Sequence, residues 1–454
     1  MKDYTQLIQK QRDFFNTNAT KSVAFRIDAL KKIYKWTQEH EKQILLALKQ
    51  DLNKSAFEAY ATEIGIVLSE ISHTLKHIKK WAKPKRVRTP LTSFKAKSYI
   101  LSEPFGVALI MSPWNYPFQL AMVPLITAIG AGNCAVVKPS AYSPATSQII
   151  FDMANDLFDE KFVSVILGGR EENQGLLDQK FDYIFFTGGV EVGKIVMSAA
   201  SKNLTPVTLE LGGKSPCIID QTADINLSAK RLIWGKLINC GQTCIAPDYL
   251  CVHSSVKEKI IEKIKEYITE FYGENPLQND SYPKMVNKKH FDRVFGLIDG
   301  KVHVGGTCDE QTLKIAPTLI DATWESKAMQ QEIFGPVLPV IEFDDLDEVI
   351  SKIKSRPKPL ALYLFTKDKC VENKVLTSVS FGGGCVNDTI MHIATNNMPF
   401  GGVGDSGMGG YHGKFGFDTF SHKKSVVKKS LAIDIKLRYP PYKDNLGLVK
   451  KVQK

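Results

Sequence analysis

The sequence has few of the features that mark membrane, fibrous or disordered proteins. Its most apolar stretch, residues 107–137, is broken by prolines, glycines and polar residues, so no uninterrupted run is long enough to span a bilayer. The 454 residues contain no internal repeat and no low-complexity segment, and 43% hydrophobic with 24% charged residues is ordinary for globular proteins. We expect a soluble chain of two or three domains.

Paired cysteine spacing is also missing. The eight cysteines are scattered, and the histidines lack metal-ligand spacing, which argues against a disulfide framework or a metal site. Residues 1–18 are polar and helical in pattern, without the apolar core of a signal peptide. These absences predict a cytoplasmic protein with free thiols, no metal and no stable membrane anchor.

The charge is basic but dispersed. The formal net charge of +11 comes mainly from scattered lysines, with some enrichment towards residue 454. No basic motif interleaved with aromatic residues accompanies it, so a solvated surface is favoured and no nucleic-acid partner is expected. A weak attraction to anionic membranes or to a phosphorylated cofactor stays open.

Short apolar runs alternate with helical patterns from residue 106 onward. This alternation is typical of a doubly wound parallel sheet, and a second α/β region covers about 212–399. Residues 95–101 and 420–429 are strand-like and lie outside both regions, so they could pair as a small flap whose exposed edges favour a homodimer. In the first region we expect strands at Val107–Met111, Cys134–Lys138, Val163–Leu167 and Tyr183–Phe186, and helices at Ala121–Gly130, Ala145–Leu157 and Val190–Ser201.

Cys244 is the most informative residue. It lies in the segment Asn239–Pro247, whose glycine, polar residues and proline predict a loop. A cysteine on such a loop is accessible to a substrate, and backbone N–H groups can stabilise its thiolate. Cys244 is therefore a candidate nucleophile for an electrophilic carbon.

Several other segments offer partners for such chemistry, each with a plainer alternative. Thr187–Lys194 ends a strand and opens a helix with glycines at 188 and 193, which suits a phosphate or is simply a strand-to-helix turn. Lys138 ends a strand, where it could bind a ribose or phosphate or be an ordinary exposed lysine. Glu210, between two leucines, could be a general base with a raised pKa or the partner of Lys214 in an ion pair.

Two further polar residues sit on turns. Asn115 lies between Pro113 and Pro117, where its amide could donate to an oxyanion or merely satisfy the loop backbone. Glu332, beside the turn Gly335-Pro336, could bind ribose hydroxyls or be a turn residue.

Taken together, these segments resemble the aldehyde dehydrogenases, in particular the shorter class 3-like group, over nearly the whole chain. The similar segments occur in the order of that family: Pro113–Pro117, Lys138–Ser140, Phe186–Gly193, Leu209–Lys214, Gly241–Cys244, Glu332–Pro336, Asn387–Asp388 and Pro399–Gly402. The resemblance implies a Rossmann-like cofactor domain (1–83 and 102–209), an α/β catalytic domain (210–402), a β-flap for oligomerisation (84–101 and 417–430) and a tail (431–454).

The resemblance also implies roles. Cys244 attacks the aldehyde, Asn115 stabilises the oxyanion, and Glu210 activates water against the resulting thioester. Binding of NAD or NADP is implied for Trp114, Lys138, Thr187, Gly188, Gly193, Leu211, Glu332 and Phe334. The substrate, an apolar aliphatic or aromatic aldehyde, is expected to contact Tyr116, Leu120, Ile245, Ile390 and Met391.

One position departs from the family pattern. Many members have a glutamate three residues after the lysine, where it binds both adenine-ribose hydroxyls and repels a 2′-phosphate; here the residue is Ala141. We therefore expect NADP to be accepted.

Two other interpretations of the function remain: a CoA-acylating or acyl-phosphate-type relative, which would not need Glu210, and a non-catalytic basic-surface protein of the same fold. Cys240, four residues before Cys244, is either a bystander or a resolving thiol.

Overall fold

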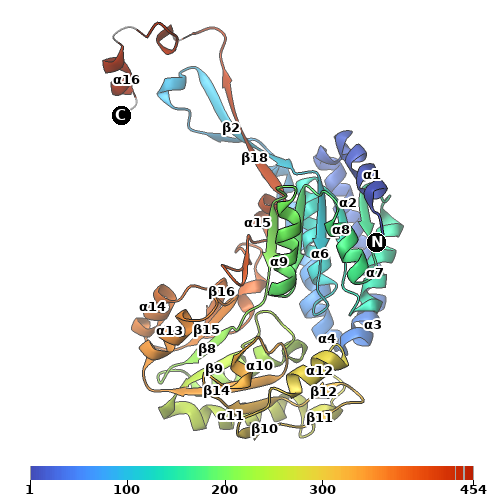
Figure 1. Cartoon of the computed structure of the whole chain (residues 1–454), viewed down its shortest axis with the longest axis vertical. Helices are drawn as coiled ribbons and strands as arrows, with labels where there is room; N and C mark the ends of the chain where they lie inside the picture. The colour runs from blue at the N-terminus through green and yellow to red at the C-terminus, as the bar shows by residue number, and fades with distance from the viewer. Residues whose placement is uncertain (1, 435, 443–444, 453–454) are drawn as a thin grey trace.

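The computed structural model describes residues 2–434, 436–442 and 445–452. Two mainly parallel β-sheets with flanking helices form the body, and a narrow arm stands away from it (Figure 1). Within the described residues, no helix combines the length and apolar character that crossing a bilayer requires. The predicted α/β fold class is confirmed.

The first sheet has the strand order β17-β7-β6-β3-β4-β5, parallel except for β17. Every residue of β3, β4 and β6 is buried, because strands covered on both faces need continuous apolar runs. The order reverses between β3 and β6, and the loops after these two strands therefore flank the ligand crevice of a doubly wound sheet. The strands are β3 (Val107–Met111), β4 (Cys134–Lys138), β5 (Val163–Val165), β6 (Tyr183–Thr187), β7 (Val207–Glu210) and β17 (Gly407–Met408).

The helices of this half include one that is buried along its whole length, α6, which packs on β3 and β4. A π-helical turn, η2 (Tyr60–Ile64), joins α4 to α5. The helices are α1 (Thr5–Asn16), α2 (Val23–Glu39), α3 (Glu41–Leu52), α4 (Ala56–Ala59), α5 (Gly65–Trp81), α6 (Gln119–Ala131), α7 (Pro144–Leu157), α8 (Arg170–Leu177), α9 (Val190–Ser201) and α15 (Gly413–Thr419).

The second sheet has the order β10-β13-β14-β9-β8-β15-β16, parallel except for β10. Its strands are β8 (Pro216–Ile219), β9 (Tyr249–His253), β10 (Val302–Val304), β13 (Thr318–Asp321), β14 (Val337–Phe343), β15 (Ala361–Phe365) and β16 (Gly383–Val386), with a separate pair β11 (Cys308–Asp309) and β12 (Lys314–Ile315). Its helices are α10 (Ile225–Leu237), α11 (Lys257–Tyr272), α12 (Lys288–Phe295), α13 (Leu346–Lys354) and α14 (Lys369–Ser378).

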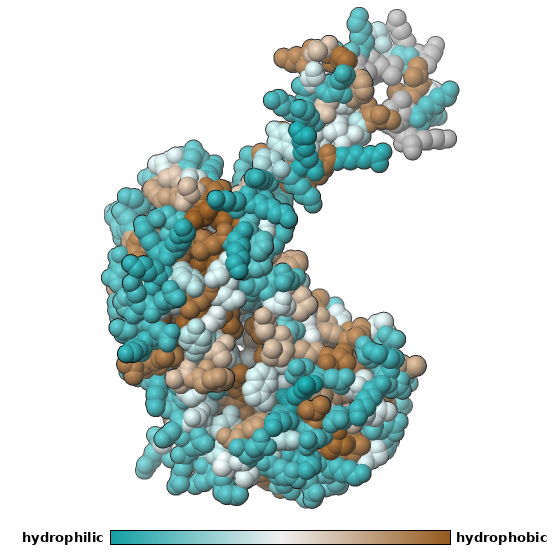
Figure 2. Space-filling view, turned by 180° about the vertical axis from the view of Figure 1, so that it is seen from behind, coloured by the Kyte–Doolittle hydropathy of each residue, from teal (hydrophilic) through white to brown (hydrophobic). Residues whose placement is uncertain are grey.

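The arm consists of β1 (Lys85–Val87), β2 (Ala96–Pro104) and β18 (Ser421–Lys429). β2 and β18 pair antiparallel along their full length, so the two expected strand-like segments do meet. Figure 2 shows the arm projecting from the body beside a broad concavity, and α16 (Leu446–Val452) lies at its far end in Figure 1. Short 3₁₀ turns complete the chain: η1 (Ala19–Lys21), η3 (Leu91–Ser93), η4 (Ile238–Gly241), η5 (Ser254–Val256), η6 (Pro276–Gln278), η7 (Lys327–Met329), η8 (Met391–Ala394) and η9 (Lys436–Arg438).

The structure differs from the sequence-based elements in several places. β5 ends at Val165 instead of residue 167, and β2 continues to Pro104 instead of stopping at 101. β9 and β13 in the second sheet were not predicted, because their apolar runs are short and stand next to prolines. β17 joins the edge of the first sheet although it lies beyond residue 402.

Asn133 ties the arm to the body. Its buried amide donates to the carbonyls of Ala128 (3.2 Å) and Phe420 (3.0 Å) and accepts from the Gly106 N–H (3.0 Å). These contacts join the end of α6 to the residues that precede β3 and β18.

We expect Asn133→Ala to lower the free energy of unfolding by about 1–3 kcal/mol, because buried backbone groups lose their partner. Urea unfolding followed by tryptophan fluorescence measures the change, with the exposed Asn203→Ala as control. Equal stability of the two variants would contradict this role.

Candidate active site

The Cys244 loop is shaped by a left-handed turn. After α10, Asn239, Cys240 and Gly241 all have positive φ (51°, 54° and 72°), which reverses the chain before Cys244. A Cβ on Gly241 would lie 2.3 Å from the Gly335 carbonyl oxygen, so only glycine permits this close packing. The turn thereby presses the cysteine segment against the segment that carries Glu332.

Glu210 is a buried carboxylate without a partner. It ends β7, where it is in register with Thr187 of β6 on one side and Gly407 of β17 on the other. Both of its carboxylate oxygens are buried and make no hydrogen bond to the described protein. Burial raises the pKa of Glu210 well above its ordinary value. The alternative of an ion pair with Lys214 is not observed, because Lys214 pairs with Asp248 instead.

Asn115 lies on the loop between β3 and α6 and is nearly fully buried. Its side-chain Nδ2 donates to the Gln242 carbonyl at 3.0 Å, which joins it directly to the cysteine loop. An amide nitrogen carries two protons, so one donor of Asn115 remains for a substrate oxygen. The neighbouring Tyr116 hydroxyl is 2.6 Å from Thr243 Oγ1, which gives the two loops a second contact.

The thiol of Cys244 is disfavoured as a thiolate in the unliganded site. Burial raises its pKa first, and the carboxylates of Glu332 and Glu210 raise it further, while the backbone N–H groups of Cys244 and Ile245 act in the opposite direction. The expectation of backbone stabilisation is thus correct in direction, but it is outweighed by burial, which the polar sequence of the loop did not predict.

Glu332 approaches the Glu210 segment from the second half of the chain. A Cβ on Gly212 would lie 2.2 Å from Glu332 Oε2, so this glycine makes room for the carboxylate. Burial, followed by the charge of Asp248, raises the pKa of Glu332 to about 8. Asp248 also accepts from the Ile333 N–H at 2.8 Å, which fixes the backbone next to Glu332.

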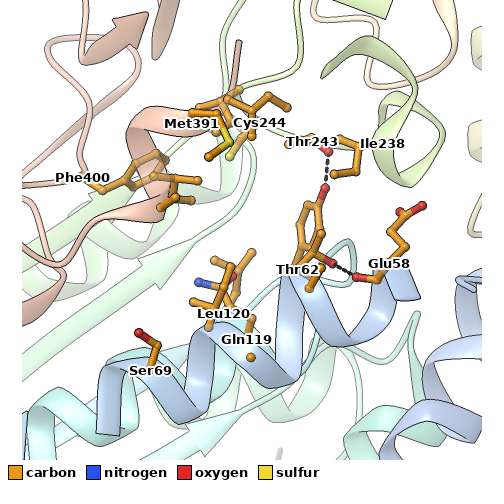
Figure 3. A pocket seen from close by; sticks show the side chains of 18 of the residues that line it. Glu58, Thr62, Ser69, Gln119, Leu120, Ile238, Thr243, Cys244, Met391 and Phe400 are labelled. Atoms are coloured by element: carbon orange, nitrogen blue, oxygen red, sulfur yellow. Dashed lines mark hydrogen bonds between the residues drawn. The ribbon is translucent and has the colours of Figure 1, made fainter. Parts of the chain in front are cut away.

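A cavity of about 570 Å³ opens onto Cys244 and Glu210. In Figure 3, Cys244 and Met391 lie together, across the pocket from the helix that carries Glu58, Thr62 and Ser69. All of Tyr116, Leu120, Ile245, Ile390 and Met391 line it, as expected. Lining residues that were not predicted include Phe57, Ala61, Thr62, Gly65, Ile66, Trp234, Ile238, Phe400 and Tyr411.

The crevice of the first sheet has the features that a dinucleotide requires. α9 begins at Val190 directly after Gly188 and Gly189, and no side chain caps its free N–H groups. A Cβ on Gly193 would lie 2.7 Å from the Leu211 side chain, so the glycine lets helix and strand pack closely. The buried Thr187 hydroxyl has no partner. The residues present therefore fit a phosphate-bearing cofactor at this helix terminus.

Lys138 stands at the carboxyl end of β4, as predicted, but it is buried rather than an exposed lysine. Its amine donates to the carbonyls of Pro139 (2.8 Å) and Gly168 (2.6 Å), and burial lowers its pKa to about 8. Trp114 and Phe334 pack edge to face with ring centroids 5.3 Å apart, which places these two predicted cofactor residues on one wall.

Cys240 faces away from the nucleophile. It is fully buried in a separate apolar cluster, its Sγ lies 3.4 Å from the Tyr282 hydroxyl, and burial raises its pKa to about 12. This placement favours the bystander reading. His392 does not line the cavity, and its Nδ1 lies 3.6 Å from Cys385 Sγ. Among the described residues, no group of three or more His, Cys, Asp or Glu side chains is arranged to hold a metal.

The two α/β units pack together and bring a cysteine, a carboxylate and an amide close to one another. They lie beside a crevice of the kind that binds dinucleotides, an arrangement typical of oxidoreductases. The model of the aldehyde dehydrogenase family matches residues 1–426. The chain belongs to this family.

Individual relatives are similar to this chain over most of their lengths. The chain is 49% identical to 4,4′-diaponeurosporen-aldehyde dehydrogenase of Staphylococcus aureus (98% of each chain) and 46% identical to aldehyde dehydrogenase family 3 member A2 of Macaca fascicularis (96% of this chain, 90% of the relative). Among solved structures, it is similar to a substrate-bound Staphylococcus aureus AldH, with a TM-score of 0.98, 48% identity and all of both chains covered. A Staphylococcus aureus betaine aldehyde dehydrogenase point mutant in complex with NAD⁺ matches with a TM-score of 0.85 at 25% identity (95% of this chain, 89% of that chain). The chain is thus an aldehyde dehydrogenase, an oxidoreductase.

We expect iodoacetamide to modify Cys244 of the unliganded enzyme slowly at pH 7, because a raised pKa leaves little thiolate. The rate at which Cys244 is labelled should keep rising at pH values above the ordinary pKa range of a thiol. Peptide mass spectrometry measures the labelling, and the exposed Cys370 is an internal control that should react first. Faster labelling of Cys244 than of Cys370 at pH 7 would contradict the electrostatics described above.

Proposed function

We propose that the protein oxidises apolar aldehydes to carboxylic acids with NAD or NADP, through a covalent intermediate on Cys244. The observation that carries the proposal is the meeting of Cys244, Glu210 and the Asn115 loop at one cavity junction. On this proposal, the first sheet with its helices (1–83 and 102–209) binds the cofactor, and 210–402 forms the catalytic domain.

In the first stage, Cys244 loses its proton to solvent, and its thiolate sulfur bonds to the carbonyl carbon, whose oxygen becomes an oxyanion. The free Asn115 amide proton and the Cys244 N–H donate to that oxygen, which stabilises the charge as it develops. When bound, the oxidised dinucleotide supplies the acceptor for the hydride that leaves this carbon. Lys138, Thr187, Gly188 and Glu332 are the residues that would hold it, with Gly193, Leu211, Trp114 and Phe334 around them.

In the second stage, Glu210 removes a proton from water, which attacks the thioester and releases the acid. A carboxylate with a raised pKa is a stronger base near neutral pH, so the burial of Glu210 suits it to this step. A CoA-acylating relative would deacylate with another nucleophile and would not need this group. The buried, unpaired Glu210 supports hydrolysis over that second reading.

The cavity supports an apolar substrate. Its walls are formed mainly by aliphatic, aromatic and methionine side chains, and none of the described lysines or arginines lines it to receive a substrate carboxylate. Aliphatic chains or aromatic rings are therefore favoured over acidic semialdehydes. The aldehyde named for the Staphylococcus aureus relative, 4,4′-diaponeurosporen-aldehyde, accords with this class.

A homodimer forms part of the proposal. β1 and β18 are the outer strands of the three-stranded arm, and each leaves an edge without a partner within the described chain. Open edges of this kind pair with other strands, and a second copy of the chain offers the same element.

Glu210→Gln tests the proposed mechanism. We expect one equivalent of reduced cofactor in a rapid burst, followed by turnover slowed ~10²–10⁴-fold, because water attack loses its base. Stopped-flow absorbance follows the burst, and mass spectrometry detects the acyl group on Cys244. Cys244→Ala is the matched control and should give neither burst nor adduct. A Glu210→Gln enzyme with normal steady-state turnover, or a wild type that requires CoA, would overturn hydrolysis by Glu210.

Ala141 tests the cofactor choice. It is exposed, three residues after Lys138, so nothing at this position repels a 2′-phosphate. We expect the kcat/KM ratio for NAD over NADP to stay below about 100, or ~2.7 kcal/mol of discrimination, and Ala141→Glu to raise it. Initial rates with both cofactors give the ratio, and the distant Asn203→Glu controls for added charge. An unchanged ratio in Ala141→Glu would contradict the assignment.

A further inference from the structure

We propose that a buried ion pair outside the reacting centre, Lys54 with Glu63, positions the Asn115 amide for catalysis. The inference rests on the proposed function, in which Asn115 stabilises the oxyanion. Lys54 and Glu63 come from the N-terminal helical region and do not line the cavity. They are positioning residues, since they act through the loop that carries Asn115.

The pair is enclosed completely. Lys54 is 1% exposed and Glu63 is 0% exposed, and Lys54 Nζ lies 2.5 Å from Glu63 Oε1. Taking two charges out of water is costly, so such a pair contributes little to stability by itself. Its retention in the core points to a geometric task.

Lys54 holds the loop at Asn115. Its amine donates to the Asn115 carbonyl at 3.0 Å and lies 3.9 Å from the centroid of the Tyr116 ring. The Tyr116 hydroxyl in turn contacts Thr243, the residue before Cys244. The Lys54 ammonium group thus contacts both the backbone of Asn115, the proposed oxyanion donor, and the ring of Tyr116, which contacts the loop of the nucleophile.

Glu63 holds the other end of the same loop. Its Oε2 accepts from the backbone N–H groups of Phe118 (2.9 Å) and Gln119 (3.2 Å), at the start of α6. The helix dipole favours a negative charge there. The loop from β3 to α6 is therefore fixed by the cation at Asn115 and by the anion three residues later.

The backbone that carries Glu63 is unusual. Glu63 lies within η2, the π-helical turn between α4 and α5. A π-turn holds one extra residue, which rotates the following side chains by roughly 100° relative to a continuous α-helix. Such turns occur often at functional sites. Here the turn carries the residue that reaches the Asn115 loop.

A second support converges on the same carbonyl. Asn239 Nδ2 donates to the Asn115 carbonyl (2.7 Å) and to the Gln242 carbonyl (3.1 Å), while the Asn239 N–H donates to Glu58 Oε1 (2.7 Å). The Asn115 carbonyl therefore accepts from Lys54 and Asn239 together. This arrangement leaves the peptide of Asn115 little freedom to rotate and fixes the direction of its side chain.

A double-mutant cycle tests the inference in the full-length enzyme. We expect Lys54→Met to lower kcat about 10–100-fold, because small displacements of a catalytic group are costly, with KM for the aldehyde and the Kd for NAD changed less than about twofold. In an Asn115→Ala background, Lys54→Met should change kcat less than about twofold, since the group that it positions is gone. Arg12→Met, which breaks the partly buried pair with Asp182, is the control and should leave kcat unchanged.

Equal effects of Lys54→Met in both backgrounds, or no effect in the first, would overturn the inference. Glu63→Gln, read through the same cycle, replaces Lys54→Met if that variant does not fold. Failure of both to fold, judged by circular dichroism, would assign the pair to stability and also overturn it. A wild type that oxidises no aldehyde would instead refute the proposed function.

Discussion

The reversal of the chain at Asn239–Gly241 is the constraint on which the site depends. Three successive left-handed residues are costly unless the surroundings hold them, and here the surroundings come from all parts of the fold. Glu58 in α4 accepts a hydrogen bond from the Asn239 N–H, and the side-chain amide of Asn115 donates to the Gln242 carbonyl. The Gly335 carbonyl packs directly against Gly241. The two sheets meet through this turn, and Cys244 is placed as a result.

Desolvation dominates the electrostatics of the site. Burial is the leading cause of the raised pKa of Cys244, Glu210 and Glu332, and the charges of Glu332 and Glu210 raise the pKa of Cys244 further. In such a site, the thiol and the two carboxyl groups tend to stay protonated until a bound ligand changes the charge around them. It is therefore suited to a chemistry in which an acid is needed at one stage and a base at another.

The fold could be predicted well where strands are covered on both faces. β3 and β4 were located to the residue, because their apolar runs are continuous and bounded by turn residues. β9 was missed because Tyr249–His253 is short, follows a proline and includes a polar end. The periodicity of a short strand is too weak to separate it from a loop.

The site was predictable only in part, for a related reason. Motif residues such as Cys244 and Glu210 stand out locally, whereas Lys54, on the link between α3 and α4, and Phe57, in α4, are locally ordinary. What makes them relevant is contact over long sequence distances, as in the bond of Lys54 to Asn115. Likewise, the polar sequence around Cys244 could not indicate that a partly exposed thiol would lie in surroundings buried enough to raise its pKa.

The wall of the cavity opposite Cys244 is built from α4, η2 and α5, which contribute no reacting group. Phe57, Ala61 and Ile66 can therefore be exchanged for larger or smaller side chains while the sheet ends that carry the chemistry stay in place. A family could diversify its substrates through this helical face alone. Unlike Glu58 and Glu63 on the same segment, the other side chains of these helices that face the cavity can therefore change to suit a new aldehyde while the reaction is preserved.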